Sequence, residues 1–299
     1  MFDPRSPYHR RRWHYDSDQP LSVPQLIARG SLDARTGGLL WLLVERHQSL
    51  IVSGPTDPTP GIGKTTTLNA LLEFLPVDTT LVYTMGMYED FDFVNDTLGD
   101  STCVLANEVS DHLPIYMWGR TARTLLTLPE NGYAVATSCH ADTIDDVLRM
   151  LRGDLRLRPE DLARLGVIVN IGLVGHVWPL RRRFLTVHFL LPANVDAKAA
   201  GSASGEEAGE ELLRLAIWDE ASDSFVPGDD AVYDRLAGHL GMARDELDAA
   251  LERRAACLQA LAAGQGAGLR PTRAAIEQLM GSEAAGSGAA TIADEGAAE

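Results

Sequence analysis

A short glycine-rich loop constrains this chain more than any other segment. Its residues, Gly61-Ile62-Gly63-Lys64-Thr65-Thr66-Thr67, follow the apolar run Leu50–Val52 and precede a helix-like stretch, Leu68–Leu72. An apolar strand, a glycine-rich loop and a helix in this order form the unit of a parallel α/β layer. In such a layer the loop falls at the carboxyl edge of the sheet, where ligands bind. The loop therefore predicts an α/β fold with a binding site at this edge.

Lysine usage singles out one residue of this loop. Lys64 and Lys198 are the chain's two lysines, so arginine supplies 24 of its 26 lysine and arginine residues. A lysine retained in such a composition suggests a task that needs a compact ammonium group. Backbone N–H groups and a helix N-terminus attract phosphates, an ammonium reaches the β/γ oxygens, and a threonine hydroxyl ligates magnesium. The predicted nucleotide-binding residues are Gly61, Ile62, Gly63, Lys64, Thr65 and Thr66.

Composition limits the other functions that this chain could have. With 299 residues, 45% of them hydrophobic, the chain can bury one core and a smaller module. A formal charge of −16 argues against wrapping a nucleic acid, which needs a large basic face. One segment departs from this acidic composition: it is basic and aromatic and consists of Arg10–Arg12 with Trp13 and Tyr15. This segment could contact an acidic partner or lipid headgroups, although a solvated tail is the preferred interpretation.

The sequence also indicates a cytosolic environment. The cysteines are far apart and lack CxxC spacing, so neither a disulfide framework nor a zinc site is expected; they are Cys103, Cys139 and Cys257. The apolar runs Leu39–Val52 and Val167–Pro179 are interrupted by charged or polar residues and are too short to cross a bilayer. The first residues carry charge without an apolar stretch, so no signal peptide is expected. Membrane association is therefore expected only through a partner.

Apolar segments alternate with helical ones around the loop. From Ser22 to His47, apolar residues recur at helical spacing in two pieces divided near Gly30. Short apolar segments that end in polar residues are typical of parallel strands covered on both faces. The expected strands are Leu50–Ser53, Thr80–Met85, Cys103–Ala106, Ala134–Ser138, Val167–Val174 and Arg183–Leu191, with helices to about Phe74 and over Trp118–Leu126. The last two strands are expected to complete the sheet.

The composition changes after Pro192. Residues up to about Glu210 are rich in alanine, glycine, serine and glutamate, which predicts an exposed linker. Beyond this linker the pattern predicts a hairpin of Leu212–Trp218 and Ser224–Val226, then helices at Ala231–Leu240, Arg244–Leu261 and Ala274–Met280. The tail after Gly281 is predicted to be disordered.

Three further segments accompany the loop in chain order. Residues 104–109 form an apolar strand that ends in Glu108, and residues 134–138 form a strand followed by Cys139-His140-Ala141-Asp142-Thr143. Residues 180–184 form a basic turn before a last strand. In this order the segments resemble type II and type IV secretion and pilus-assembly ATPases, closest to the Flp/Tad pilus and archaeal-type members. The resemblance covers about residues 21–191, and residues from Leu213 onward resemble the small C-terminal module of the same family.

The histidine segment is the most specific part of this resemblance. A lone histidine after a strand is usually structural, and a strand-end glutamate is usually just solvated. We use the name phosphate loop for residues 54–67, which include the glycine-rich segment. Behind this loop and an apolar strand ending in Glu108, His140 occupies the position of the family's histidine box. This combination favours a functional role for both residues.

The resemblance implies an architecture and an order of regions. The implied fold is a RecA-like P-loop core, with a mostly parallel sheet and helices on both faces, plus a small and mainly helical C-terminal module. The implied regions are an irregular basic N-terminus (1–20), an ATPase domain (21–192), a linker (193–210), the C-terminal module (211–282) and a disordered tail (283–299).

The resemblance also implies roles for individual residues, with ATP and Mg²⁺ as ligands. Lys64 would bind the β/γ phosphates, and Thr65 would hold the magnesium ion. Glu108 would polarise the attacking water or complete the metal shell. His140 would sense the γ-phosphate and relay its loss. Asp90 would stand where the family's acidic box lies.

Several departures from the family pattern favour binding over fast turnover. The insertion Asp57–Pro60 places Pro58 where the first glycine of GxxxxGK[ST] is expected, and its two prolines remove N–H donors. Gly86 and Met87 replace an acidic pair, and Ser110 stands where an arginine usually follows. The stretch between Glu108 and the histidine segment is longer than usual. We also expect the family's large N-terminal domain, which supplies arginine contacts across subunits, to be lacking.

The resemblance implies a motor subunit that acts in a homo-hexameric ring on an inner-membrane platform protein, at the inner face of the cell membrane. A neighbouring subunit's arginine would complete the site, and the candidates are Arg120, Arg123, Arg181, Arg182 and Arg183. One alternative is a degenerate relative that binds ATP with little hydrolysis and serves as a regulatory or structural subunit. A small-molecule P-loop kinase is disfavoured because no lid or acceptor site is recognisable and because of the histidine segment.

Overall fold

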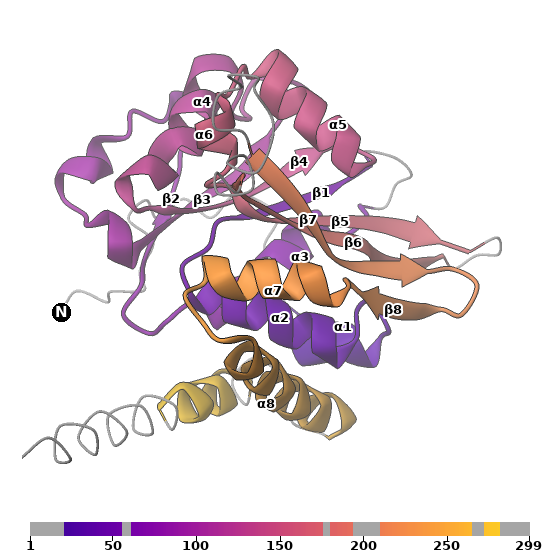
Figure 1. The fold of residues 1–299 in the computed structure, drawn as a ribbon. Helices are drawn as coiled ribbons and strands as arrows, with labels where there is room; N and C mark the ends of the chain where they lie inside the picture. The colour runs from indigo at the N-terminus through magenta and orange to yellow at the C-terminus, as the bar shows by residue number, and fades with distance from the viewer. Residues whose placement is uncertain (1–20, 56–60, 176–179, 194–209, 265–271, 282–299) are drawn as a thin grey trace, which may run out of the picture.

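The computed structural model describes residues 21–55, 61–175, 180–193, 210–264 and 272–281 (Figure 1). The predicted irregular N-terminus, the insertion in the phosphate loop, nearly all of the predicted linker and the C-terminal tail lie outside these residues.

An eight-stranded sheet forms the centre of the fold, with the strand order β2-β3-β4-β1-β5-β6-β7-β8. The strands are β1 (Leu50–Gly54), β2 (Thr80–Tyr83), β3 (Thr102–Val109), β4 (Ala134–His140), β5 (Gly166–Val174), β6 (Arg181–Pro192), β7 (Glu210–Asp219) and β8 (Ser224–Pro227). The pairs from β2 to β5 are parallel, and the pairs from β5 to β8 are antiparallel. The predicted α/β fold with a mostly parallel sheet is therefore confirmed.

Two expectations about the end of the sheet are wrong. β6 does not complete the sheet, because β7 pairs with β6 and β8 pairs with β7, so the C-terminal hairpin extends it. Residues 181–183 do not form a turn, because they already pair with residues 172–174 of β5. Pairing with β5 provides partners for the backbone N–H and C=O groups of these arginines. The strand therefore begins at Arg181, two residues earlier than predicted.

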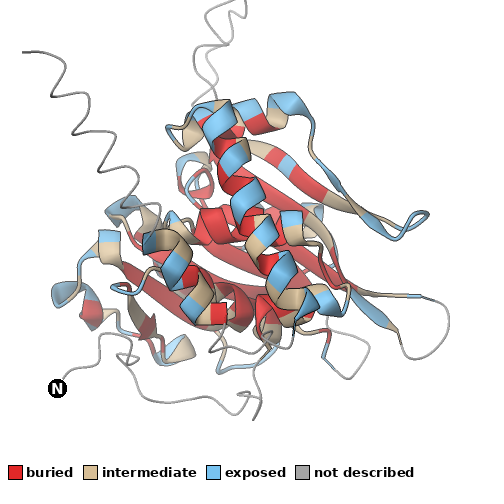
Figure 2. Ribbon diagram, turned by 90° about the horizontal axis from the view of Figure 1, so that it is seen from below, coloured by how far each residue is buried: buried red, intermediate tan, exposed pale blue. Residues whose placement is uncertain are grey.

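Helices cover both faces of the sheet (Figure 1). One face carries α1 (Val23–Ala28), α2 (Ala34–Glu45), α3 (Lys64–Leu71), α7 (Asp230–His239) and α8 (Arg244–Ala263), and the other carries α4 (Gly119–Thr127), α5 (Ile144–Arg149) and α6 (Pro159–Leu162). Residues 272–281 are also helical. Neighbouring residues of β1 alternate between the two cores, since Leu50 and Val52 join the first and Ile51 the second. Figure 2 shows the strands mostly buried between these layers.

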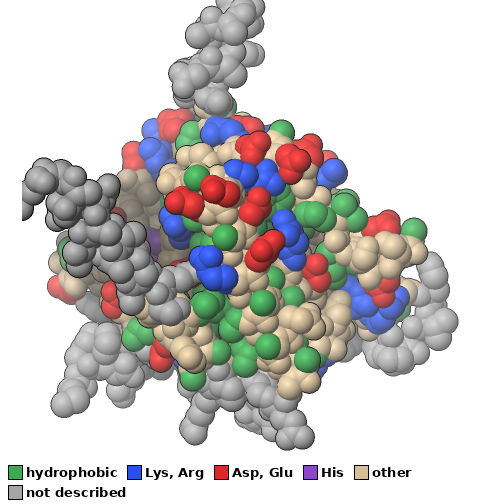
Figure 3. Space-filling view, turned by 60° about the horizontal axis from the view of Figure 1, so that its bottom comes forward, with side chains coloured by type: hydrophobic (Ala, Val, Ile, Leu, Met, Phe, Trp, Pro, Cys, Tyr) green, Lys and Arg blue, Asp and Glu red, His purple; other side chains and the backbone are tan. Residues whose placement is uncertain are grey.

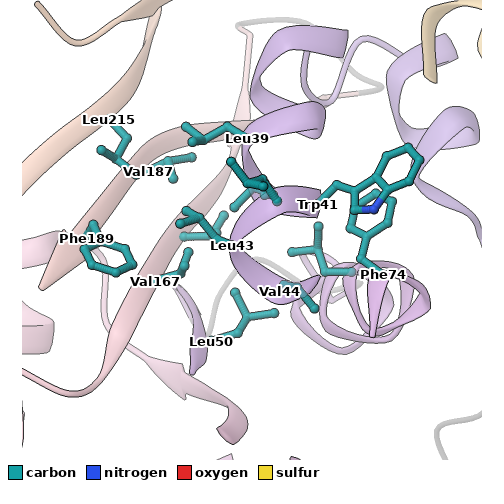
Figure 4. Close-up of a cluster of buried hydrophobic side chains, with 14 of the residues drawn as sticks. Leu39, Trp41, Leu43, Val44, Leu50, Phe74, Val167, Val187, Phe189 and Leu215 are labelled. Carbon is teal, nitrogen blue, oxygen red and sulfur yellow. The ribbon is translucent and has the colours of Figure 1, made fainter. Parts of the chain in front are cut away.

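The first core centres on α2, which is buried along nearly its whole length. The ring of Trp41 stacks on that of Phe74 with centroids 5.3 Å apart (Figure 4). α8 covers the outer side of α2 at a close approach, because a Cβ added to Gly38 would lie 2.9 Å from the backbone nitrogen of Ala255. Glycine at position 38 therefore permits the contact between the two helices.

Charges on the outer surface are mixed in sign. The face that holds α8 shows acidic and basic side chains interspersed (Figure 3). Arg244 at the start of α8 illustrates this, since it forms ion pairs with Asp230, Asp234 and Asp248. Within the described residues, no helix combines the length and the apolar character needed to cross a bilayer.

A buried histidine on β6 makes stability depend on pH. His188 is 5% exposed, and its Nδ1 has no hydrogen-bond partner among the described residues. Burial, reinforced by nearby Arg214, lowers the pKa of His188 from 6.5 to about 4. Between these pH values the unfolded chain binds more protons than the folded one, so the free energy of unfolding falls as the pH falls from 6.5 to 4.

We expect this histidine to account for up to about 3 kcal/mol of acid destabilisation. Urea unfolding of the parent and of His188→Leu at pH 7 and pH 4.5 measures the effect. The variant should lose less stability than the parent over this interval. An equal loss in both proteins would mean that other groups cause the acid sensitivity.

Candidate functional site

The predicted site residues come together at the carboxyl end of the parallel strands. β4 lies between β1 and β3 in the sheet, so the loop after β1 and the ends of β3 and β4 are neighbours. Lys64 begins α3 directly after the loop, Glu108 lies near the end of β3, and His140 ends β4. Three segments that are far apart in sequence therefore place one functional group each at the same edge.

The phosphate loop ends in a turn that requires glycine. Gly63 precedes α3 with φ at +103°, in the left-handed region where other residues are strained. The N–H of Thr67 donates to the carbonyl of Gly63 at 2.8 Å and closes the first turn. No side chain of the described residues caps this helix. The N–H groups of the first turn thus remain available to an external acceptor, which is the property that an anion needs.

Lys64, His140 and Glu108 form a connected row. The ammonium of Lys64 donates to Nδ1 of His140 at 2.9 Å and also lies 3.5 Å from the carbonyl oxygen of Gly54. Nε2 of His140 lies 2.5 Å from Oε1 of Glu108. Because Nδ1 accepts from an ammonium, Nε2 carries the ring proton and faces the carboxylate. Oε1 of Glu108 is buried and lies directly against this edge of the ring.

A second histidine covers this row. The ring of His112, from the segment after β3, stacks on that of His140 with centroids 4.8 Å apart and an angle of 25° between the rings. The side chain of His140 is 18% exposed and that of Glu108 is 11% exposed. The row is therefore largely shielded from bulk water, which strengthens interactions between its charges.

Burial shifts the pKa values of two neighbouring groups. Burial lowers the pKa of Lys64, and the nearby carboxylate of Glu108 opposes this shift. Burial raises the pKa of Cys139, the residue before His140, to about 12. The thiol of Cys139 is therefore protonated at neutral pH and does not act as a nucleophile.

A cavity of about 370 Å³ adjoins these groups, a size typical of small-molecule sites. Its walls come from the phosphate loop, from the ends of β3 and β4, and from the segment after β3. They include Gly61, Ile62, Gly63, Lys64, Thr65, Thr66, Glu108, Ile115, Tyr116, Met117 and His140. All six predicted nucleotide-binding residues and both predicted catalytic residues thus face one cavity, although their roles stay predictions.

Sequence reasoning missed Asn170, which supports the histidine segment. Asn170 is 3% exposed within the otherwise apolar β5. Its amide donates to the hydroxyl of Ser53 and to the carbonyl oxygens of Ala141 and Asp142, at 3.0, 3.3 and 3.0 Å. These bonds connect β1 and β5 to the turn after His140. The sequence did contain a signal for this role, namely an asparagine within an apolar strand. A buried amide of this kind needs hydrogen-bond partners.

The predicted acidic box does not reach the cavity. Asp90 is exposed, is absent from the cavity walls, and accepts from the N–H of Asp92 at 3.1 Å. Its neighbour Glu89 is buried and accepts from the N–H groups of Met85 and Phe91 at 2.7 and 3.0 Å. The buried carboxylate of this segment therefore organises a turn.

The candidate arginines divide into two groups. Arg120 and Arg123 are exposed on α4. Arg181 and Arg183 both pair with Asp223 in the turn between β7 and β8, and Arg182 contacts the phosphate loop of its own chain. The three arginines of β6 thus have partners within the chain, whereas those of α4 face solvent.

Comparisons with known proteins give limited likenesses. No family model matches the chain. The uncharacterized protein MJ0900 of Methanocaldococcus jannaschii is 42% identical over 59 residues, which is 20% of this chain and 10% of that protein. The chain thus aligns with about a tenth of the length of this relative.

The VirB11 ATPase from the type IV secretion system of Brucella suis, in a crystal structure with sulphate, is 18% identical. The match covers 51% of each chain with a TM-score of 0.37. This likeness concerns the fold alone and adds nothing to what the strand order and the phosphate loop establish. The chain is a mixed α/β protein with a glycine-rich loop at the carboxyl edge of its parallel strands.

Proposed function

We propose that this protein binds Mg-ATP at the cavity beside Lys64 and hydrolyses it. The observation that carries this proposal is the convergence of Lys64, His140 and Glu108 beside the uncapped first turn of α3. A lysine and free N–H groups suit phosphate oxygens. The carboxylate of Glu108, which lines the same cavity, suits the acceptance of a proton from water.

The described residues fit a magnesium ion only together with a nucleotide. No group of three or more His, Cys, Asp and Glu side chains within them is arranged to hold a metal. Magnesium favours few protein ligands, with phosphate oxygens and water completing its shell. The hydroxyl of Thr65 and the carboxylate of Glu108 line the same cavity and would supply the protein's share. The ion would neutralise phosphate charge during transfer.

The chain's own groups change partners in this proposal. The ammonium of Lys64 leaves Nδ1 of His140 and contacts phosphate oxygens. Nδ1 then becomes free to accept a new hydrogen bond, while Nε2–H continues to face Glu108. The carboxylate of Glu108 accepts a proton from the attacking water, whose oxygen then bonds to the γ-phosphorus as the bond to ADP breaks. His140 thereby connects phosphate occupancy at Lys64 to the carboxylate.

At the level of the cell, we propose a motor subunit of a type II or type IV secretion or pilus-assembly system. This step rests on the resemblance of the four sequence segments. It includes a ring of identical subunits, an arginine from a neighbour at each site, and contact with an inner-membrane platform protein. Arg120 and Arg123 are the best candidates for the neighbour's arginine. Both are exposed, and neither side chain has a partner among the described residues of its own chain.

The alternative is a subunit that binds ATP with little hydrolysis. The contacts that join Lys64, His140 and Glu108 favour this possibility, because each of these side chains already contacts another one of the three. Turnover of the purified protein, with and without phospholipid and the platform protein, separates the two. Hydrolysis stimulated by either addition supports the motor, and ATP binding without turnover under all conditions supports the alternative.

Lys64→Ala tests the nucleotide site directly. The variant should bind ATP about 10- to 100-fold more weakly, because it loses a charge-assisted contact worth about 1.5–3 kcal/mol. Calorimetric titration measures the affinity. Lys198→Ala is the matched control, since it removes the chain's other lysine. Equal affinity of Lys64→Ala and the parent would overturn the assignment.

A further inference from the structure

Arg182 contacts the phosphate loop from the side away from the cavity of Lys64. Its Nε donates to the carbonyl of Ile62 at 3.2 Å, and its Nη2 donates to the carbonyl of Gly61 at 3.1 Å. Its stem passes beside Gly63, where an added Cβ would lie 3.6 Å from Cδ of the arginine. We propose that Arg182 is a positioning residue that fixes the phosphate loop in its nucleotide-binding conformation, an inference that rests on the proposed function.

Peptide geometry explains how a contact to carbonyl groups can position N–H groups. In a trans peptide the C=O of one residue and the N–H of the next lie in one plane and point in opposite directions. When Arg182 draws the carbonyls of Gly61 and Ile62 toward itself, the N–H groups of Ile62 and Gly63 turn to the opposite side. The same contact keeps two carbonyl dipoles away from phosphate oxygens, which they would repel.

The loop separates two cavities, and this arrangement supports the proposed direction. The cavity of about 370 Å³ that holds Lys64 and Glu108 lies on one side of the loop. A second cavity of about 280 Å³, lined by the arginines of β6, lies on the other, and Gly61, Ile62 and Gly63 line both. Arg182 therefore acts from the second cavity on the wall of the first.

The sequence of this loop explains why an added restraint on its backbone would be useful. Prolines precede Gly61 where the pattern would place a glycine and backbone donors, so the first half of the loop has fewer N–H groups to hold its shape around phosphate. A bidentate guanidinium can replace part of that restraint, because its planar fork binds two acceptors in a fixed geometry. Lysine cannot do so in the same way.

The side chain of Arg182 is directed to the loop by its neighbours on β6. Successive side chains of a strand point to opposite faces, so Arg181 and Arg183 share one face and Arg182 has the other. Both neighbours bind Asp223: Nη1 of Arg181 at 2.6 Å, and Nε of Arg183 at 3.0 Å. The hairpin of β7 and β8 thereby fixes the face of β6 from which Arg182 reaches the loop.

Three variants test the proposal. Arg182→Ala should bind ATP about tenfold more weakly in calorimetric titration. Arg182→Lys should be equally weak, because a single ammonium keeps the charge but not the two-carbonyl contact. Arg253→Ala is the matched control, since it removes the same charge from an exposed arginine of α8 that lines neither cavity. Its affinity should stay within about twofold of the parent. Thermal unfolding of all three confirms folding.

A measurement without nucleotide separates this proposal from the proposed function. NMR order parameters of the Ile62 and Gly63 amides should fall from about 0.85 to below about 0.6 in Arg182→Ala, and should be unchanged in Arg253→Ala. Full affinity of Arg182→Lys would assign the effect to charge and overturn the proposal. Unchanged order parameters in Arg182→Ala would also overturn it. A parent that binds no ATP would refute the proposed function, while the order parameters would still decide the role of Arg182.

Discussion

Glu108→Gln is expected to lower ATP turnover by about 10²-fold or more while ATP affinity stays close to that of the parent. Glutamine keeps the size of the side chain, but its amide does not accept a proton as a carboxylate does. Glu108 lies beside His140 and lines the cavity that contains Lys64. The proposed proton acceptor is thus removed without disturbing phosphate contacts.

Single-turnover and steady-state hydrolysis, with affinity from calorimetry, measure this effect. His140→Ala should also depress turnover with little change in affinity, because it interrupts the row between Lys64 and Glu108. Glu130→Gln is the control, since this exposed glutamate is absent from the cavity walls. Parental turnover in both the Glu108 and His140 variants would show that these roles are wrong. A parent without turnover in its assembled state would favour the binding-only alternative.

Glu45→Ala is expected to reduce the free energy of unfolding by about 3–5 kcal/mol. Arg254 of α8 is 2% exposed, and its Nη2 and Nε donate to Oε2 of Glu45 at 2.8 and 3.1 Å. The guanidinium also lies 5.5 Å from the ring centroid of Trp41. Removing the carboxylate of Glu45 takes away a charged acceptor from this buried guanidinium, which costs more than the pair contributes.

Urea unfolding of four proteins checks this expectation. Glu252→Ala, an exposed glutamate on the same helix as Arg254, is the control and should change stability by less than about 0.5 kcal/mol. The double variant Glu45→Ala/Arg254→Met should recover much of the loss, because an apolar side chain replaces the buried charge. A single variant as stable as the parent would mean that water reaches the guanidinium and that the pair does not anchor α8 to α2.

Local sequence patterns determined the elements and the location of the site. The apolar run before Gly61 and the helical spacing after Lys64 predicted β1 and α3, because period and turn chemistry act over a few residues. They also placed Glu108 and His140 at strand ends. α5 was missed although Thr143 and Asp146 form a capping box at its start, a signal that the sequence does contain.

Only the tertiary structure decided which of these groups meet and what supports them. The hairpin of β7 and β8 joins the sheet because long-range pairing with β6, separated by a long connection, satisfies its backbone. The same pairing aligns Arg181 and Arg183 with Asp223, and so turns Arg182 toward Gly61 and Ile62. The bonds of Asn170 to the turn after His140 and the burial of Arg254 against Glu45 likewise join residues distant in sequence. Such contacts depend on strand register and helix packing, which periodicity does not encode, so the sequence indicated the functional groups and the fold brought them together.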